Sequence, residues 1–180
     1  PDYAPLQSAR VEAVKLLVNA QPGDVDRCRA TTRDANLFFL ARLFADFQNG
    51  RVVRAGDFAE WQKHDMERMY ARGVRYYEVH NEPNLNVEGF SASWRNGNEF
   101  EEWFLQVVDI LQPLFPDARF GFPGCSPGGD IPGRRQGMWR FLDQCEAAIA
   151  AADWIGVHSY WTDETEMRSR DHGMGFLEYG

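Results

Sequence analysis

The feature that most constrains the fold of this chain is the alternation of short apolar runs with longer amphipathic segments. Five runs have the length of a strand and are rich in β-branched or aromatic residues. They are Val11–Val18, Leu37–Phe44, Arg75–His80, Arg119–Pro123 and Trp154–Tyr160. The segments between them read as helices, most clearly at Phe58–Ala71, Phe100–Phe115 and Met138–Ala151. The pattern predicts a regular succession of strands and helices.

Strict alternation of this kind predicts right-handed βαβ units and a parallel sheet. The runs begin at residues 11, 37, 75, 119 and 154, on average about 36 residues apart. Eight such units would need roughly 290 residues, within the usual range of a (β/α)₈ barrel. A doubly wound sheet fits the alternation equally well. We expect residues 1–180 to be one domain, truncated at both ends.

Polar residues at the ends of the runs separate these two folds. A barrel gathers its chemistry at the carboxyl ends of many strands, whereas a doubly wound sheet binds ligands at one crevice. Polar side chains lie in or just after nearly every run: Lys15, Asn19, Arg42, Asp46, His80, Asn81, Glu82, Ser126, His158 and Tyr160. The predicted fold class is therefore α/β, a partial TIM barrel.

Composition excludes several classes of function. The net charge of −8 argues against a nucleic-acid partner, which favours a basic face. No stretch approaches the roughly 20 apolar residues of a membrane span. The three cysteines match no zinc or redox spacing, so we expect them to be reduced and structural. His80 and His158 have no ligand-spaced partner, and no metal site is predicted.

The sharpest local signal is the segment Val79–Leu85, in which His80, Asn81, Glu82 and Pro83 follow one another at a strand end. Proline does not continue a strand ladder and disfavours the α region for the preceding residue, so Glu82 is predicted to be extended. Glycoside cleavage needs a carboxylic acid to protonate the departing oxygen. A solvated turn after the strand is the alternative interpretation of these residues.

The run Tyr76–Leu85 resembles the fourth-strand motif of clan A glycoside hydrolases, the retaining (β/α)₈ enzymes. In that clan an Asn-Glu pair ends the fourth strand and its Glu is the general acid/base. The resemblance assigns those positions to Asn81 and Glu82. Trp154–Trp161 resembles the sixth strand, where the clan often places a His or Tyr that contacts the nucleophile. His158 and Tyr160 occupy the matching places, and the chain then covers strands two to six.

The chain departs from that pattern in two respects. The arginine of the clan usually ends the second strand, whereas Arg42 lies on the third by this count; we retain it as a candidate substrate-binding residue. The nucleophile Glu of the clan ends the seventh strand and is expected beyond residue 180. Glu178 has no strand context and is not assigned this role.

Aromatic residues near strand ends are candidates for stacking on sugar faces. Trp161 is the first choice and Trp94 the second, although Trp94 also fits packing within its loop. His80 is interpreted either as a substrate contact or as a core histidine below the site. Three tryptophans lie on helical stripes and are predicted to be core: Trp61, Trp103 and Trp139. Two histidines are predicted to lie on the surface: His64 and His172.

Three other functions remain open. Lys15, between apolar residues of the first run, would serve an aldolase-type barrel as a Schiff-base amine; a lysine paired to a carboxylate is the alternative. The glycines of Gly121–Gly129 would suit an anion, although they lack the known phosphate-loop spacings. A non-catalytic carbohydrate-binding barrel is the third.

The function that best accounts for these residues is hydrolysis of O-glycosidic bonds by a retaining two-carboxylate mechanism. Glu82 is the proposed acid/base, Asn81 would hold a sugar hydroxyl, and His158 and Tyr160 would orient the nucleophile. The expected partner is an oligosaccharide, polysaccharide or other glycoside. No cofactor is expected.

Overall fold

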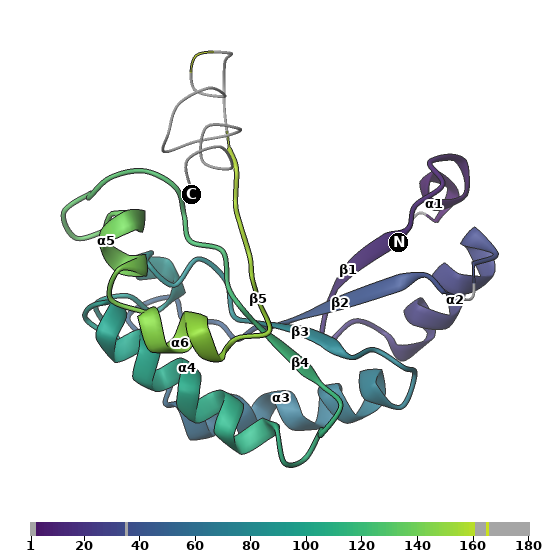
Figure 1. Ribbon diagram of the computed structural model, residues 1–180, viewed down its shortest axis with the longest axis horizontal. Helices are drawn as coiled ribbons and strands as arrows, with labels where there is room; N and C mark the ends of the chain where they lie inside the picture. Colours follow the sequence, from purple (N-terminus) through teal and green to yellow (C-terminus); the bar gives the residue numbers. More distant parts are fainter. Residues whose placement is uncertain (1–2, 35, 161–164, 166–180) are drawn as a thin grey trace.

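A computed structural model describes residues 3–34, 36–160 and 165. Its centre is a parallel sheet with the strand order β1-β2-β3-β4-β5. The strands are β1 (Ala13–Leu17), β2 (Phe38–Leu43), β3 (Tyr76–Val79), β4 (Arg119–Phe122) and β5 (Trp154–Ile155). Each strand pairs with its successor in the sequence, so the predicted α/β alternation is confirmed (Figure 1).

Helices connect the strands and cover one face of the sheet, and one further short helix precedes the first strand. They are α1 (Ala4–Ser8), α2 (Pro22–Thr32), α3 (Ala55–Tyr70), α4 (Gly97–Leu111), α5 (Met138–Leu142) and α6 (Glu146–Ala151), with a 3₁₀ turn η1 (Asn86–Glu88). Figure 1 shows α3 and α4 under the convex face of the curved sheet, with α6 beside α4. The strands leave a concave face on the opposite side.

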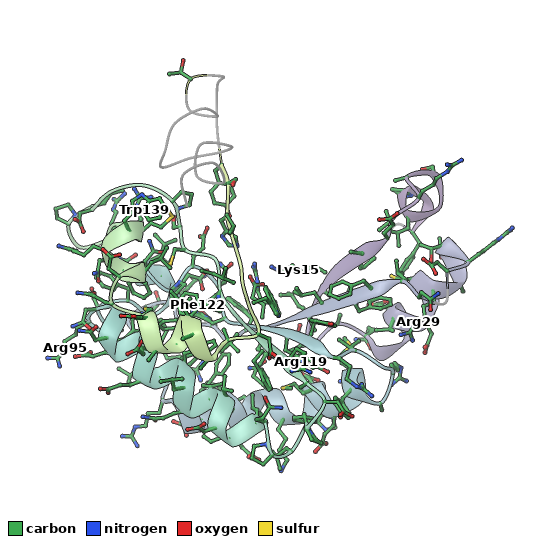
Figure 2. The ribbon with its side chains drawn as sticks, viewed as in Figure 1. Lys15, Arg29, Arg95, Arg119, Phe122 and Trp139 are labelled. Atoms are coloured by element: carbon green, nitrogen blue, oxygen red, sulfur yellow. The ribbon has the colours of Figure 1, made fainter. Side chains whose placement is uncertain are left out.

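The core lies between the sheet and these helices. Phe122 of β4 packs on Phe100 and Phe104 of α4, with ring centroids 5.7 and 5.5 Å apart. Lys15 points to the concave side instead (Figure 2). Burial of large aromatic rings is the dominant stabilising term in such a layer. The sheet therefore has an apolar face toward the helices and a charged face toward the concave side.

Predictions for the helical tryptophans are only partly confirmed. Trp103 is buried, as expected. Trp61 is 44% exposed, with the Arg51 guanidinium 4.8 Å from its ring centroid, so its predicted core position is wrong. Trp139 is half-buried at the edge of the core. The helical stripe predicts the face of α3 that packs on the core. Trp61 lies at the margin of that face, where the Arg51 guanidinium lies over its ring.

The predicted helix Met138–Ala151 is two helices, because contacts with α4 interrupt it. The side-chain carbonyl of Gln144 accepts hydrogen bonds from the Gly97 amide, at 3.0 Å, and from Gln136 Nε2, at 2.7 Å. Cys145 Sγ donates to the Gly97 carbonyl at 3.2 Å. These long-range bonds fix residues 143–145 as turns between α5 and α6, so the prediction of one continuous helix is wrong.

The last strand is shorter than the predicted Trp154–Tyr160. Its ladder with β4 contains two residue pairs, Gly121 with Trp154 and Phe122 with Ile155. The last bond of this ladder runs from the Gly156 amide to the Phe122 carbonyl, at 2.7 Å. The chain beyond β5 runs toward the site without strand pairing. Within the described residues, no helix has both the length and the apolar character that crossing a membrane requires.

Candidate active site

The segment after β3 has an unusual backbone. His80 and Glu82 have φ angles of 75° and 39°, a region that residues with a Cβ rarely adopt. The predicted extended conformation of Glu82 is therefore wrong. Its amide donates to the Gly124 carbonyl at 3.1 Å, and its carbonyl accepts from the Leu85 amide at 2.9 Å. These bonds impose a turn that aims the Glu82 side chain, as often occurs at functional sites.

Asn84 ties this turn to the loop after β4. Its side chain is fully buried. Nδ2 donates to the carbonyls of Ser126, at 2.8 Å, and Gln136, at 3.0 Å. Oδ1 accepts from the Ser126 amide at 2.8 Å. Because every polar atom of the amide group is used, Asn84 rigidly supports the backbone beside Glu82.

Glu82 is the centre of a group of polar side chains. Its Oε1 contacts His158 Nδ1 at 2.8 Å and accepts from the Tyr160 hydroxyl at 3.0 Å. Burial opposes ionisation of the carboxyl, but the bonds from His158 and Tyr160 outweigh it, and the Arg42 charge adds to them, so the pKa of Glu82 is lowered. The pKa of Tyr160 is raised to about 12 by burial and by its bond to Glu82. Glu82 is thus an ionised, oriented carboxylate.

Three further charges lie behind His158. Arg42 Nη2 is 3.4 Å from His158 Nε2, and Arg42 Nε donates to Glu78 Oε2 at 2.8 Å. Lys15 also pairs with Glu78. Glu78 has a side chain only 1% exposed. Burial opposes its ionisation, yet hydrogen bonds from Arg42 and Lys15 prevail and lower the pKa of Glu78. The pairing of Arg42 with Glu78 in the strand register explains their contact.

Asn81 is held by a second acidic residue. Its Nδ2 donates to Glu88 Oε1 at 2.9 Å, and its Oδ1 is buried and has no hydrogen-bond partner among the residues that the structure describes. The pKa of Glu88 is raised, mainly by burial and also by the charge of Glu82, against the bond from Asn81. Asn81 is therefore oriented by the chain itself at a position next to Glu82.

Two predicted substrate contacts lie in the core instead. His80 is 0% exposed, and its Nε2 donates to the Glu88 carbonyl at 2.6 Å. Trp94 is 1% exposed, and its indole donates to the Pro83 carbonyl at 2.7 Å. Both rings pack around Phe47. Because buried rings offer no face to a sugar, the substrate-binding assignments of His80 and Trp94 are corrected to structural ones.

Several predicted residues lie outside the described part of the chain: Trp161, His172 and Glu178. His64 is exposed on α3, as expected. Among residues 3–34, 36–160 and 165, no group of three or more potential ligands is arranged to hold a metal ion. Lys15 forms an ion pair with Glu78, which agrees with the alternative to a Schiff-base role, a lysine paired to a carboxylate.

Sequence reasoning missed three residues of this site. Glu78 was read only as part of an apolar run, although a lone carboxylate inside a strand signals a buried partner. Glu88 and Asn84 lie in a loop whose spacing predicts no contact. Glu78 bonds Arg42, 36 residues away, and Asn84 bonds the Gln136 carbonyl, 52 residues away. Glu88 bonds Asn81 across a turn that the sequence does not predict.

Comparisons with known proteins support the architecture. No protein-family model matches the chain, and curated proteins gave no match. The crystal structure of a GH128 (subgroup II) endo-β-1,3-glucanase from Sorangium cellulosum superposes with a TM-score of 0.59 at 17% identity. The match covers 99% of this chain and 65% of the glucanase. An arginine decarboxylase of Paramecium bursaria Chlorella virus gives a TM-score of 0.48 at 12% identity, over 84% of this chain and 40% of its own.

The glucanase match, at low identity, establishes the fold alone. The chain has the α/β fold of part of a TIM barrel, with a structural likeness to a glycoside hydrolase. It spans about two thirds of the length of the glucanase, so the activity of a whole enzyme does not follow from the match.

Proposed function

We propose that this protein hydrolyses O-glycosidic bonds by a retaining mechanism in which Glu82 is the acid/base. The observation that carries the proposal is the position of Glu82 after β3, on a constrained turn, with two hydrogen-bond donors on one carboxylate oxygen. Active sites of (β/α)₈ barrels lie at this end of the strands. The likeness to an endo-β-1,3-glucanase makes a polysaccharide the first substrate class to test.

In the first step, Glu82 gives its proton to the glycosidic oxygen as the bond to the anomeric carbon breaks. A second carboxylate forms a new bond to that carbon. In the second step, Glu82 removes a proton from water, the water oxygen bonds to the anomeric carbon, and the ester bond breaks. The lowered pKa of Glu82 suits the second step directly. The first step requires a second negative charge nearby, because like charges raise a carboxyl pKa.

The second carboxylate must lie about 5–5.5 Å from Glu82 in a retaining enzyme. Glu78 is held by Lys15 and Arg42 and is almost fully buried, so it does not reach a sugar. Glu88 is bonded to Asn81. We therefore assign the nucleophile to neither, and expect it beyond residue 180.

The Schiff-base alternative has less support. Lys15 is in an ion pair with Glu78, and an ammonium held by a carboxylate has no lone pair for a carbonyl carbon. The other alternative is a carbohydrate-binding barrel without catalysis, and the experiment below distinguishes it from a hydrolase.

The test is Glu82→Ala in the intact protein, with Glu102→Ala on the exposed face of α4 as the control. On β-1,3-glucan, kcat should fall by roughly 10²- to 10⁴-fold, the usual contribution of general acid–base catalysis. Aryl glycosides with good leaving groups need no protonation, so their first step should be little affected. Azide should then restore turnover and give a glycosyl azide of retained configuration.

Equal losses on both substrate classes, without azide rescue, would reject the acid/base role. A wild-type protein that binds polysaccharides in calorimetry but releases no reducing sugar would favour the non-catalytic barrel.

A further inference from the structure

A chain of polar contacts leads from inside the curved sheet to the proposed acid/base. It runs from Glu78 of β3 to Arg42 of β2, then to His158 after β5, and ends at Glu82. The links are 2.8, 3.4 and 2.8 Å long. Four residues from three strands and their following loops therefore form one connected path, although Arg42 and His158 are 116 positions apart.

The path fixes which ring nitrogen of His158 carries the proton. A guanidinium only donates hydrogen bonds, so Nε2, which faces Arg42, must be the acceptor in the neutral ring. Nδ1 then carries the hydrogen and donates it to Glu82. An ionised carboxylate only accepts, so the Glu82 side of the ring requires the same tautomer. In the opposite tautomer Nε2–H would face the Arg42 donor, and the Nδ1 lone pair would face the Glu82 carboxylate. The Tyr160 hydroxyl is 3.2 Å from Nδ1, but it donates its hydrogen to Glu82, at 3.0 Å.

Glu78 holds Arg42 in the orientation that this requires. Its side chain is 1% exposed and bonds the guanidinium through Nε, leaving Nη2 free to reach His158. The segment after β5 packs directly on this carboxylate, since a Cβ at Gly156 would lie 2.9 Å from Glu78 Oε1. A second cation, Lys15, neutralises the same carboxylate from β1. The carboxylate is thus a fixed anchor within the fold.

We propose that Glu78 is a positioning residue, which holds Arg42 against Nε2 of His158 so that the ring proton lies on Nδ1 and faces Glu82. Its catalytic consequence rests on the proposed function of Glu82. When Glu82 has given up its proton, the Nδ1 hydrogen stabilises the resulting carboxylate. With the proton on Nε2, that stabilisation is replaced by repulsion from a lone pair. Loss of the anchor therefore lowers kcat more than it alters KM.

The first test needs no substitution and no substrate. In the intact, ¹⁵N-labelled wild-type protein, the ring-nitrogen shifts of His158 report which nitrogen is protonated, and we expect protonated Nδ1 and bare Nε2. Protonated Nε2 would overturn the proposal. A protein that has the expected tautomer but does not hydrolyse glycosides would instead refute the proposed function and leave the tautomer assignment standing.

The second test is Glu78→Gln, with Glu99→Gln at the exposed pair with Arg95 as the matched control. In Glu78→Gln we expect Nε2-protonated ring to appear and kcat to fall roughly tenfold to hundredfold, the scale of a small misplacement of catalytic groups. KM should change less than kcat, and the control should match wild type in both readouts.

An unchanged His158 tautomer in folded Glu78→Gln would overturn the positioning role. If that variant does not fold, Arg42→Met decides, because it leaves the Glu78–Lys15 pair intact. A mixed tautomer in Arg42→Met supports the proposal, and an unchanged one contradicts it.

Discussion

At the scale of single residues, His80 shows how the fold overrides an ordinary ionisation. The ring is enclosed by aromatic side chains, including Phe47, Phe58 and Trp94. Burial removes the water that would solvate its charged form, and the pKa of His80 falls to about 4. The residue is therefore neutral in the folded protein near neutral pH, and it packs below the turn that carries Glu82.

This depressed pKa predicts a loss of stability in acid. The unfolded chain binds a proton at His80 below its ordinary pKa of about 6.5, whereas the folded chain does so only below about 4. Stability is full above pH 6.5 and falls as the pH approaches 4, by about 3 kcal/mol for this group. His80→Gln should remove that part of the pH dependence in chemical unfolding, and exposed His64→Gln should not. Parallel stability curves for wild type and His80→Gln would contradict the assignment.

For single residues, local sequence signals predict some positions correctly and give no information about others. The identity of Glu82 as the carboxylate at a strand end came from its neighbours, since a proline after Asn-Glu is a local signal. Of the two interpretations of Trp94, the structure supports packing within its loop, since the indole is buried and donates to the Pro83 carbonyl. Exposure is a property of the folded chain.

At the scale of elements, the close approach of β4 and the segment after β5 positions His158. A Cβ at Gly124 would lie 2.6 Å from His158 Cδ2 and 3.0 Å from its Nε2. These distances leave no room for a methyl group beside the ring. Glycine at position 124 therefore lets the imidazole lie flat against the backbone after β4, between Arg42 and Glu82.

The contact predicts that Gly124→Ala displaces the imidazole. Hydrolysis should fall because the donor to Glu82 is lost, by roughly a hundredfold if the shift approaches 1 Å. Because Gly124 is buried, the added methyl group should also lower the stability, by about 1–3 kcal/mol. Gly129→Ala, where a Cβ meets nothing within 4 Å, is the control. Wild-type kcat in Gly124→Ala would indicate that the ring moves without consequence. Activity and circular dichroism measure the two effects separately.

Element boundaries were predicted well where local signals mark them. The starts of α3 and α4 lie three residues before the predicted ones, and α4 begins after Asn96, whose side chain accepts from the Glu99 amide. The division between α5 and α6 was not predicted. It depends on Gln144 and Cys145 meeting the Gly97 backbone, and no helix propensity encodes a contact with a residue 47 or 48 positions away.

At the scale of the whole molecule, the three cysteines lie in the packed interior. Cys28, Cys125 and Cys145 are all free and buried. Burial raises the pKa of each thiol, so little thiolate is present near neutral pH. The cysteines therefore serve as apolar core residues, in agreement with the prediction that they are structural.

Thiol labelling tests this placement. Ellman's reagent at pH 8 should react with none of these three thiols in the native protein, and with all three after denaturation in guanidinium. Rapid labelling before denaturation would show that the core opens at the site of the reactive cysteine. Mass mapping of the labelled peptide would identify which one.

The sequence by itself determined the parallel α/β alternation and the position of an Asn-Glu pair at a strand end. Both are encoded locally, in apolar runs of strand length between helical stripes of period 3.6 and in an Asn-Glu-Pro sequence directly after one run. The extended conformation that proline favours for Glu82 is not adopted. Only the tertiary structure decided that Arg42, Glu78 and His158 form a path to Glu82, and that His80 is core. Those contacts join strands that are adjacent in space and distant in sequence, so their geometry exists only once the sheet has formed.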